Sequence, residues 1–264
     1  MQRKGLFIIA VLTGAALEPA FLSQLRLLRV IPLGGTLHHV QGIDVEAGKL
    51  WVTSVDSNSR KGYLHRFDLS SGKLEKEVEL QDGEKFHPGG IALDGCAVWV
   101  PVAEYRRDGK STIERRDKRT LERLESFSVD DHIGCVAAAR ELLIGGNWDS
   151  RQIYYWDRRG RLVKKHENRA ANRYQDLKVV DGELVGSGNL SRDEGAIDWL
   201  ELNSLQLLRR IRAGKTDRGV LFTNEGMAFR DSKLYLLPED GPVACSSTSG
   251  RSDGRSLYFG GAPL

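Results

Sequence analysis

The chain has 264 residues, of which 40% are hydrophobic and 28% are charged, and it contains 29 glycines and 7 prolines. This composition excludes a disordered, collagen-like or disulfide-dense protein. The formal net charge is +3, from 39 basic and 36 acidic residues, which argues against a nucleic-acid partner because such proteins need a basic surface to displace counterions from phosphates.

The first 16 residues have the pattern of a secretory signal peptide. Arg3 and Lys4 precede an apolar run over 6–12, and small residues follow up to Ala16. This run is shorter than the roughly 20 residues that span a bilayer. An uncleaved anchor or a plain tail is the alternative. We expect cleavage after Ala16, a periplasmic or secreted location without stable membrane insertion, and one domain over 22–264.

Five segments of the chain repeat one pattern at intervals of 41 to 50 residues. Their equivalent apolar positions are Ile43, Ile91, Val136, Leu177 and Met227. Each is followed by a turn, a second apolar strand, a polar loop, a third strand such as GYLHRFDL and a fourth such as LEKEVEL. Four short strands in a period of about 40–50 residues are typical of a β-propeller blade.

The number of repeats predicts an all-β, five-bladed propeller. The last repeat begins at Asn224 and has no clear fourth strand, whereas 25–33 reads as an isolated fourth strand. We therefore expect the N-terminal strand to close the ring, which removes exposed sheet edges. Six blades are the alternative, if 246–264 holds more structure than its loop-like composition indicates.

Polar residues gather where the first strand of a repeat starts and where the second ends. First strands line the channel of a propeller and their neighbours run antiparallel, so both places lie at one mouth. Polar groups that converge there predict a small-molecule site. The candidate ligand-binding residues are Gln41, Asn147, Trp148, Asp149, Gln175, Asp176, Asn189, Asn224 and Glu239.

Three histidines, His39, His87 and His132, start the first strands of successive repeats. Imidazole ligands with an open position predict a divalent metal such as zinc. Structural histidines that cap turns are the alternative. A calcium site of oxygen ligands, including Glu225 and Asn147 together with Asn189, is a further alternative.

The same mouth carries carboxylates that could act as a catalytic base, namely Glu225, Asp56 and Glu104. Within the blades, we expect His39 to meet Asp56, and Glu225 to meet Glu239 or Asp240. A bound metal would polarise a carbonyl group and activate water.

Serine–arginine pairs precede the third strand in several repeats, as in 59–60, 150–151 and 191–192. Their recurrence predicts structural ties between blades, because a guanidinium group can bind carbonyl and carboxylate oxygens together. An arginine ring that selects an anionic ligand is the alternative.

The order of Gln41-Gly42, Trp51, Ser59-Arg60 and the stretch FDLSSGKL resembles the blade pattern of bacterial and plant-type glutaminyl cyclases, which are five-bladed propellers. More broadly, 38–240 resembles gluconolactonase-like and strictosidine-synthase-like propellers, and secreted bacterial propellers of unknown function. The cyclase family carries a catalytic glutamate in a second-blade FxEG motif. Gly89 stands at that place in this chain.

The gluconolactonase resemblance implies a metal held by a glutamate, an asparagine and an aspartate, for which Glu225, Asn147 and either Asp198 or Asp240 are the counterparts. We expect an exported propeller with a small-molecule site, acting as a metal-dependent hydrolase of lactones or esters with zinc or calcium. A non-catalytic propeller that binds a ligand or a protein is the alternative, and a glutaminyl-cyclase-like acyltransferase is another. We expect a monomer with a small-molecule ligand.

Overall fold

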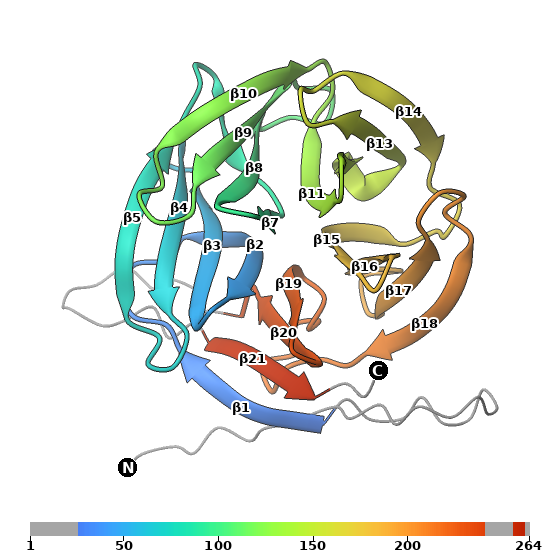
Figure 1. Ribbon diagram of the computed structural model, residues 1–264. Helices are drawn as coiled ribbons and strands as arrows, with labels where there is room; N and C mark the ends of the chain where they lie inside the picture. Colours follow the sequence, from blue (N-terminus) through green and yellow to red (C-terminus); the bar gives the residue numbers. More distant parts are fainter. Residues whose placement is uncertain (1–25, 241–255, 262–264) are drawn as a thin grey trace, which may run out of the picture.

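A computed structural model describes residues 26–240 and 256–261 of the chain, and the predicted signal peptide over 1–16 lies outside the described residues. The strands in these ranges form five antiparallel sheets around a common axis (Figure 1). This arrangement confirms the prediction of an all-β propeller. No helix in the described part of the chain is long and apolar enough to cross a membrane.

The first two sheets follow the repeats in chain order. The first contains β2 (His39–Glu46), β3 (Lys49–Asp56), β4 (Lys61–Asp68) and β5 (Leu74–Leu80). The second contains β6 (Lys85–Pro88), β7 (Ala92–Asp94), β8 (Ala97–Glu104), β9 (Ser111–Asp117) and β10 (Arg123–Val129). Its inner strand is therefore split into two pieces, β6 and β7, which both pair with β8.

The third and fourth sheets have four strands each. The third contains β11 (Ile133–Ala139), β12 (Leu142–Asn147), β13 (Gln152–Asp157) and β14 (Leu162–Glu167), with the short 3-10 helix η2 (Trp148–Ser150) after β12. The fourth contains β15 (Arg173–Val180), β16 (Glu183–Asn189), β17 (Gly195–Glu201) and β18 (Leu207–Ala213).

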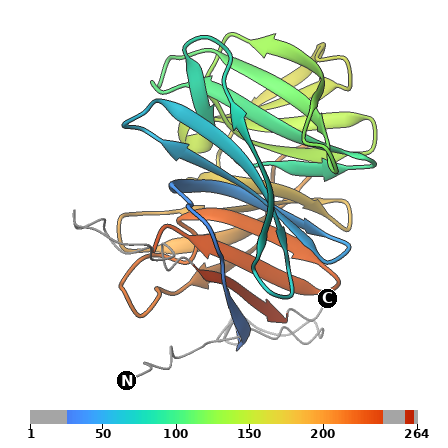
Figure 2. The ribbon, with the colours of Figure 1, turned by 90° about the vertical axis from the view of Figure 1, so that its left-hand side faces the viewer.

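The fifth sheet joins the two ends of the described chain. It contains β19 (Glu225–Arg230), β20 (Lys233–Pro238), β21 (Ser256–Gly261) and β1 (Arg26–Pro32), in the order β1-β21-β20-β19. β21 pairs antiparallel with β20 on one side and with β1 on the other. Figures 1 and 2 show β1 and β21 side by side at the edge of the ring.

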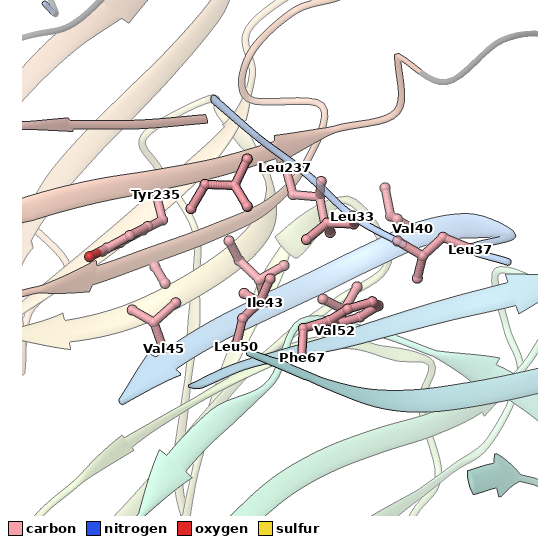
Figure 3. Close-up of a cluster of buried hydrophobic side chains, with 12 residues drawn as sticks. Leu33, Leu37, Val40, Ile43, Val45, Leu50, Val52, Phe67, Tyr235 and Leu237 are labelled. Carbon is pink, nitrogen blue, oxygen red and sulfur yellow. The ribbon is translucent and has the colours of Figure 1, made fainter. Parts of the chain in front are cut away.

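The apolar positions that define the repeat form the inner layer of the core. Ile43, Ile91, Val136, Leu177 and Met227 all have no exposed surface. Between the first and fifth sheets, Val40 and Val52 pack with Tyr235 and Leu237, and Leu33 and Leu37 of the segment between β1 and β2 cover them (Figure 3). Each buried side chain of this size contributes about 1.5–3 kcal/mol, so the apolar pattern of the repeat holds the sheets together.

Near the axis, the inner strands approach each other at glycines too closely for a Cβ atom to fit. A Cβ atom on Gly89 would lie 2.0 Å from the carbonyl oxygen of Gly134, and one on Gly42 would lie 2.3 Å from the Cα atom of Gly90. The Gly90 amide donates to the carbonyl of Gly134 at 2.9 Å. Gly89 is thus required by packing between the second and third sheets, which explains why no glutamate stands there.

A buried ion pair lies between the inner strands, close to the axis of the ring. Asp176 has no exposed surface, and its carboxylate lies 2.6 Å from the Lys178 ammonium group. It also accepts hydrogen bonds from the backbone amides of Ile43 (3.1 Å) and Met227 (3.0 Å), while Lys178 donates to the carbonyl of Ile91 (2.9 Å). We call Asp176 and Lys178 the axial pair. It links the fourth sheet to the first, second and fifth sheets.

Candidate functional site

A cavity of about 180 Å³ lies at one mouth of the channel, and we call it the mouth pocket. It is built where inner strands start and second strands end, as the repeat predicts. Its lining residues are His39, Gln41, His87, Tyr105, His132, Gly134, Asn147, Trp148, Asp149, Tyr174, Gln175 and Glu225. Most of the residues predicted from the repeat are therefore brought together in one place.

Local irregularities in the inner strands aim residues into this pocket. The pairing register skips one residue at Gln41 in β2, at Gly134 in β11 and at Gln175 in β15. Each of these is a β-bulge, which bends the strand and re-aims the extra residue. All three extra residues line the mouth pocket, so the bulges supply part of its wall.

Glu225 is the most perturbed acid of the mouth pocket. Its residue is 7% exposed, and burial raises the pKa of its carboxyl group from 4.5 to about 7, with the neighbouring Glu239 carboxylate acting in the same direction. Its backbone has a φ of 106°, a region that a non-glycine residue enters only with strain. A buried acid with a near-neutral pKa, held in a strained conformation, is typical of a functional group.

His39 lies between two carboxylates at the edge of the same pocket. Its Nδ1 atom is 3.0 Å from Oε2 of Glu239, and its Nε2 atom is 3.9 Å from Oε1 of Glu225. Glu239 does not line the pocket, but it also accepts the backbone amide of Val40 at 2.8 Å. Glu239 therefore positions His39, and His39 faces Glu225. The expected neighbour of His39, Asp56, lies instead 3.8 Å from Nδ1 of His38, so that pairing is wrong by one residue.

His132 has a fixed proton position. Its Nδ1 atom is 2.9 Å from the carbonyl oxygen of Glu104 and 3.0 Å from that of Arg106. Carbonyl oxygens can only accept hydrogen bonds, so Nδ1 carries the proton, and in the neutral ring Nε2 carries the lone pair. Burial holds the pKa of His132 below its usual value. His132 is thus a neutral imidazole with Nε2 as its basic atom.

Aromatic rings form the wall of the pocket around His87. The rings of His87 and Tyr105 are stacked, with 4.3 Å between their centroids. The rings of Trp148 and His132 meet edge to face, with 4.5 Å between their centroids. Burial, followed by the nearby His132, holds the pKa of His87 well below its usual value. Its buried Nδ1 atom has no hydrogen-bond partner among the described residues. This wall offers planar surface to a ligand and one unsatisfied polar atom.

Trp148 is held from outside by charged groups. The Arg107 guanidinium carbon lies 5.6 Å from its ring centre, and the same guanidinium group pairs with Asp149 at 2.8 Å. Asp149 and Ser150 both have positive φ values, 59° and 49°. The backbone turn at η2 and this cation–π contact fix the orientation of Trp148.

Six predicted site residues do not line the mouth pocket. Asp56 caps its own turn by accepting from Ser59, which together with the backbone amides there lowers its pKa. The Glu104 side chain accepts from Arg106 at 2.7 Å. Asp176 belongs to the axial pair, and Glu239 positions His39. Asn189 and Asn224 line a second cavity that shares Asp149 and Gln175 with the first.

The three histidines predicted as metal ligands all line the mouth pocket. Among the described residues, however, no three His, Cys, Asp or Glu side chains form a group that could hold a metal ion. Nδ1 of His132 is committed to two carbonyls, and Nδ1 of His39 to Glu239. A histidine that binds a metal through Nε2 usually has its Nδ1 held by an oxygen atom in this way, so the three-histidine site stays a prediction.

The oxygen ligands expected for calcium are also engaged. The Asn147 side chain donates to Asp131 and accepts the amide of Gln152, each at 2.9 Å. Oδ1 of Asn189 accepts from Thr223 at 3.0 Å. Asp198 pairs with Arg210 at 2.6 Å inside the fourth sheet. These contacts hold the loops together, and the calcium site stays a prediction.

One chain of residues has the connectivity of a catalytic triad. Oγ of Ser54 is 2.8 Å from Nε2 of His65, and Nδ1 of His65 is 2.9 Å from Oε2 of Glu77. Ser54 and His65 have no exposed surface. The three residues come from neighbouring strands β3, β4 and β5. They tie the first sheet together, and a substrate cannot reach the serine.

The sequence patterns missed Tyr105, Tyr174 and Gly134 in the pocket wall. Tyr105 follows Glu104 at the end of β8, as Trp148 follows Asn147 at the end of β12. An alignment of second-strand ends could have found Tyr105 by this equivalence. Tyr174 and Gly134 lie next to or within bulges, which no repeat pattern reveals.

Residues 53–180 match the model of a family of unknown function (DUF6454). No curated protein matches the chain. Among solved structures, glutaminyl cyclase of Myxococcus xanthus is similar with a TM-score of 0.63 and 13% sequence identity, over 89% of this chain and 94% of that chain. This likeness confirms the propeller fold that the sequence resemblance implies.

Two further solved structures show weaker likeness. The WD40 domain of Neurospora crassa Pan2 has a TM-score of 0.49 and 10% identity over 81% of this chain and 60% of that chain. BamB from Moraxella catarrhalis has a TM-score of 0.43 and 12% identity over 86% of this chain and 61% of that chain. The chain thus spans under two thirds of these two proteins.

Proposed function

We propose that the chain is a five-bladed propeller that catalyses acyl transfer on a small molecule in the mouth pocket, with hydrolysis of a small ester or lactone as the reaction. The five sheets of the described residues support five blades, and the pairing of β1 with β21 supports closure by the N-terminal strand. Export directed by 1–16 belongs to the same proposal and is supported by its basic and apolar residues.

The observation that carries this proposal is Glu225. Its pKa of about 7 gives a carboxylate basic enough to take a proton from water near neutral pH, and a carboxylic acid able to return it. His39, held by Glu239, lies 3.9 Å from this carboxyl group. The aromatic wall of Tyr105 and His87 lies on the same pocket and can hold the substrate.

The reaction consumes one water molecule. The Glu225 carboxylate takes a proton from water while the water oxygen forms a bond to the carbonyl carbon of the substrate. The amide of Gln41 donates one N–H to the carbonyl of Val40 at 2.9 Å and has a second N–H for the oxygen that becomes negative. The carbon–oxygen bond to the leaving alkoxide then breaks, and Glu225 returns the proton to that alkoxide.

Cyclisation of glutamine, the reaction named by the similar solved structure, is also an acyl transfer. Its family glutamate would stand at Gly89, where a Cβ atom would lie 2.0 Å from Gly134. The acid of this chain comes from the fifth sheet instead. We therefore propose hydrolysis of an ester or lactone as the reaction. The test below also includes a peptide with an N-terminal glutamine, so that cyclisation is measured beside hydrolysis.

The test measures turnover of p-nitrophenyl acetate, δ-valerolactone and an N-terminal glutamine peptide. We expect hydrolysis of the ester or lactone, with kcat/KM rising with pH through an apparent pKa of about 7. Glu225→Gln should lower kcat by about 100-fold or more, because general-base catalysis contributes about 10²–10⁴-fold.

The matched control is Glu141→Gln. Glu141 is exposed in the turn between β11 and β12, at the opposite end of these strands from the mouth pocket, so it should keep full activity. Turnover that is equal in the wild type and Glu225→Gln would contradict the proposal. Binding of these compounds without turnover by the wild type would favour a non-catalytic binding propeller.

A further inference from the structure

A second cavity of about 460 Å³ adjoins the mouth pocket, and we call it the arginine groove. The two cavities share Asp149 and Gln175 in their walls. The groove is also lined by Arg173 at the start of β15 and by Arg192 in the loop between β16 and β17. A molecule bound at Glu225 could therefore extend directly into a region with two guanidinium groups.

The arginines of the mouth fall into two kinds. Arg106 pairs with Glu104 at 2.6 Å, and Arg107 pairs with Asp149 at 2.8 Å. Arg60 pairs with Glu84. Each of these three arginines therefore has its charge balanced by a neighbouring carboxylate, and Arg60 is the one that belongs to the serine–arginine pairs.

Arg173 and Arg192 differ, because neither has an acidic partner within ion-pair distance in the described part of the chain. The one hydrogen bond of the Arg173 side chain goes from Nε to the carbonyl of Asn189 at 3.3 Å. The acid next to Arg192, Asp193, pairs with Lys215 at 2.9 Å. The groove therefore holds two positive charges whose nearby acids are occupied elsewhere.

Amide side chains complete the groove. Nδ2 of Asn189 donates to Oδ1 of Asn224 at 3.2 Å, and Oδ1 of Asn189 accepts from Thr223. This orientation leaves the Asn224 amide nitrogen as a donor. Two guanidinium groups and an amide N–H in one concave site match the acceptor oxygens of a carboxylate or phosphate.

We propose that the arginine groove binds an anionic group of the substrate, so that the substrate class is a small ester or lactone that carries a carboxylate or phosphate. This inference rests on the proposed function for the reacting group, which lies at Glu225. Arg173 and Arg192 hold the anion, and the shared wall at Gln175 sets the distance between the anion and the acyl group.

The test measures binding by isothermal titration calorimetry with glutarate, inorganic phosphate and the uncharged glutaramide. We expect at least one anion to bind, and glutaramide to bind about tenfold more weakly, because a charge-assisted hydrogen bond is worth about 1.5–3 kcal/mol. Glutarate alone would identify a carboxylate as the recognised group, and phosphate alone would identify a phosphoryl group.

The variant Arg173→Gln with Arg192→Gln should lose about tenfold in affinity for the anion and none for glutaramide. Arg151→Gln is the matched control, because Arg151 also follows a serine before a third strand and lines neither cavity. Both arginines of the groove are exposed, so the double variant should fold, and its thermal unfolding is recorded beside that of the single variant Arg192→Gln.

Three results would overturn the inference: no binding of either anion, equal binding of glutarate and glutaramide, or equal affinity of the double variant and the wild type. Its failure is separable from failure of the proposed function. Anion binding that depends on the two arginines, without any Glu225-dependent turnover, would keep the groove and reject the reaction. Turnover that depends on Glu225, with no anion binding, would keep the reaction and reject the groove.

Discussion

Replacement of Glu225 by glutamine should make the protein more stable, and by an amount that depends on pH. The pKa of the Glu225 carboxyl group is about 7 in the folded chain, against 4.5 for an ordinary glutamate. The folded state thus holds this proton more tightly than the unfolded chain does. The stabilisation from the proton is fully present below pH 4.5 and is lost as pH rises through 7.

The expected magnitude follows from the shift. The pKa rises from 4.5 in the unfolded chain to about 7 in the folded chain. This shift corresponds to about 3 kcal/mol of unfolding free energy, which is lost as the pH rises from acid to alkaline values. Glutamine has the shape of the protonated acid and cannot ionise. It also keeps the same backbone strain at a φ of 106°, because neither residue is a glycine, so the strain cancels in the comparison.

Urea unfolding of the wild type and Glu225→Gln at about pH 4 and about pH 8.5 measures this effect. We expect near-equal stability at the lower pH and a gain of about 3 kcal/mol for the variant at the higher pH. A gain of equal size at both pH values, or a loss at the higher one, would refute the assignment of Glu225 as a buried acid with a raised pKa. Glu141→Gln serves again as the exposed control.

Three further predictions concern the axis and the pocket. Asp176→Ala should lower the unfolding free energy in urea titrations by about 3–5 kcal/mol, because it leaves the Lys178 ammonium group buried without its partner. A loss below about 1 kcal/mol would reject the axial pair as a link between sheets. Gly89→Ala should destabilise by about 2 kcal/mol or more, whereas Gly214→Ala, with open space around its Cβ position, should change the melting temperature little. If the three pocket histidines bind a metal through Nε2, metal analysis by mass spectrometry should find a stoichiometric metal that is lost in their triple alanine variant, and a metal-free wild type would reject the histidine site.

The fold could be predicted because the apolar pattern repeats. A position such as Ile43 recurs at nearly constant spacing and ends fully buried each time, since every sheet must bury the same inner face. The break between β6 and β7 could not be predicted this way. It arises at Gly89 and Gly90, where two inner strands come within contact distance, and that is a property of the assembled ring.

The candidate site could be predicted as a region but not residue by residue. The repeat places both Gln175 and Asp176 at the mouth, and simple strand alternation cannot say which of them faces the pocket. The bulge at Gln175 decides it, because the extra residue turns to the pocket while Asp176 turns to the axis. The same kind of bulge at Gln41 shifts the frame, so that His38 and not His39 meets Asp56.

The close packing at the axis also bears on why we place the proposed reaction at the mouth. Below the pocket, the inner strands meet at glycines that leave no room for a Cβ atom, and the side chains of Asp176 and Lys178 bridge the neighbouring strands. Within the channel, a ligand therefore meets side chains where the strands start, in the mouth pocket. Glu225 stands at the first position of β19, at the margin between this packed axis and the open mouth. Its burial, and with it the raised pKa on which the proposed reaction depends, is thus a consequence of how tightly the ring closes beneath it.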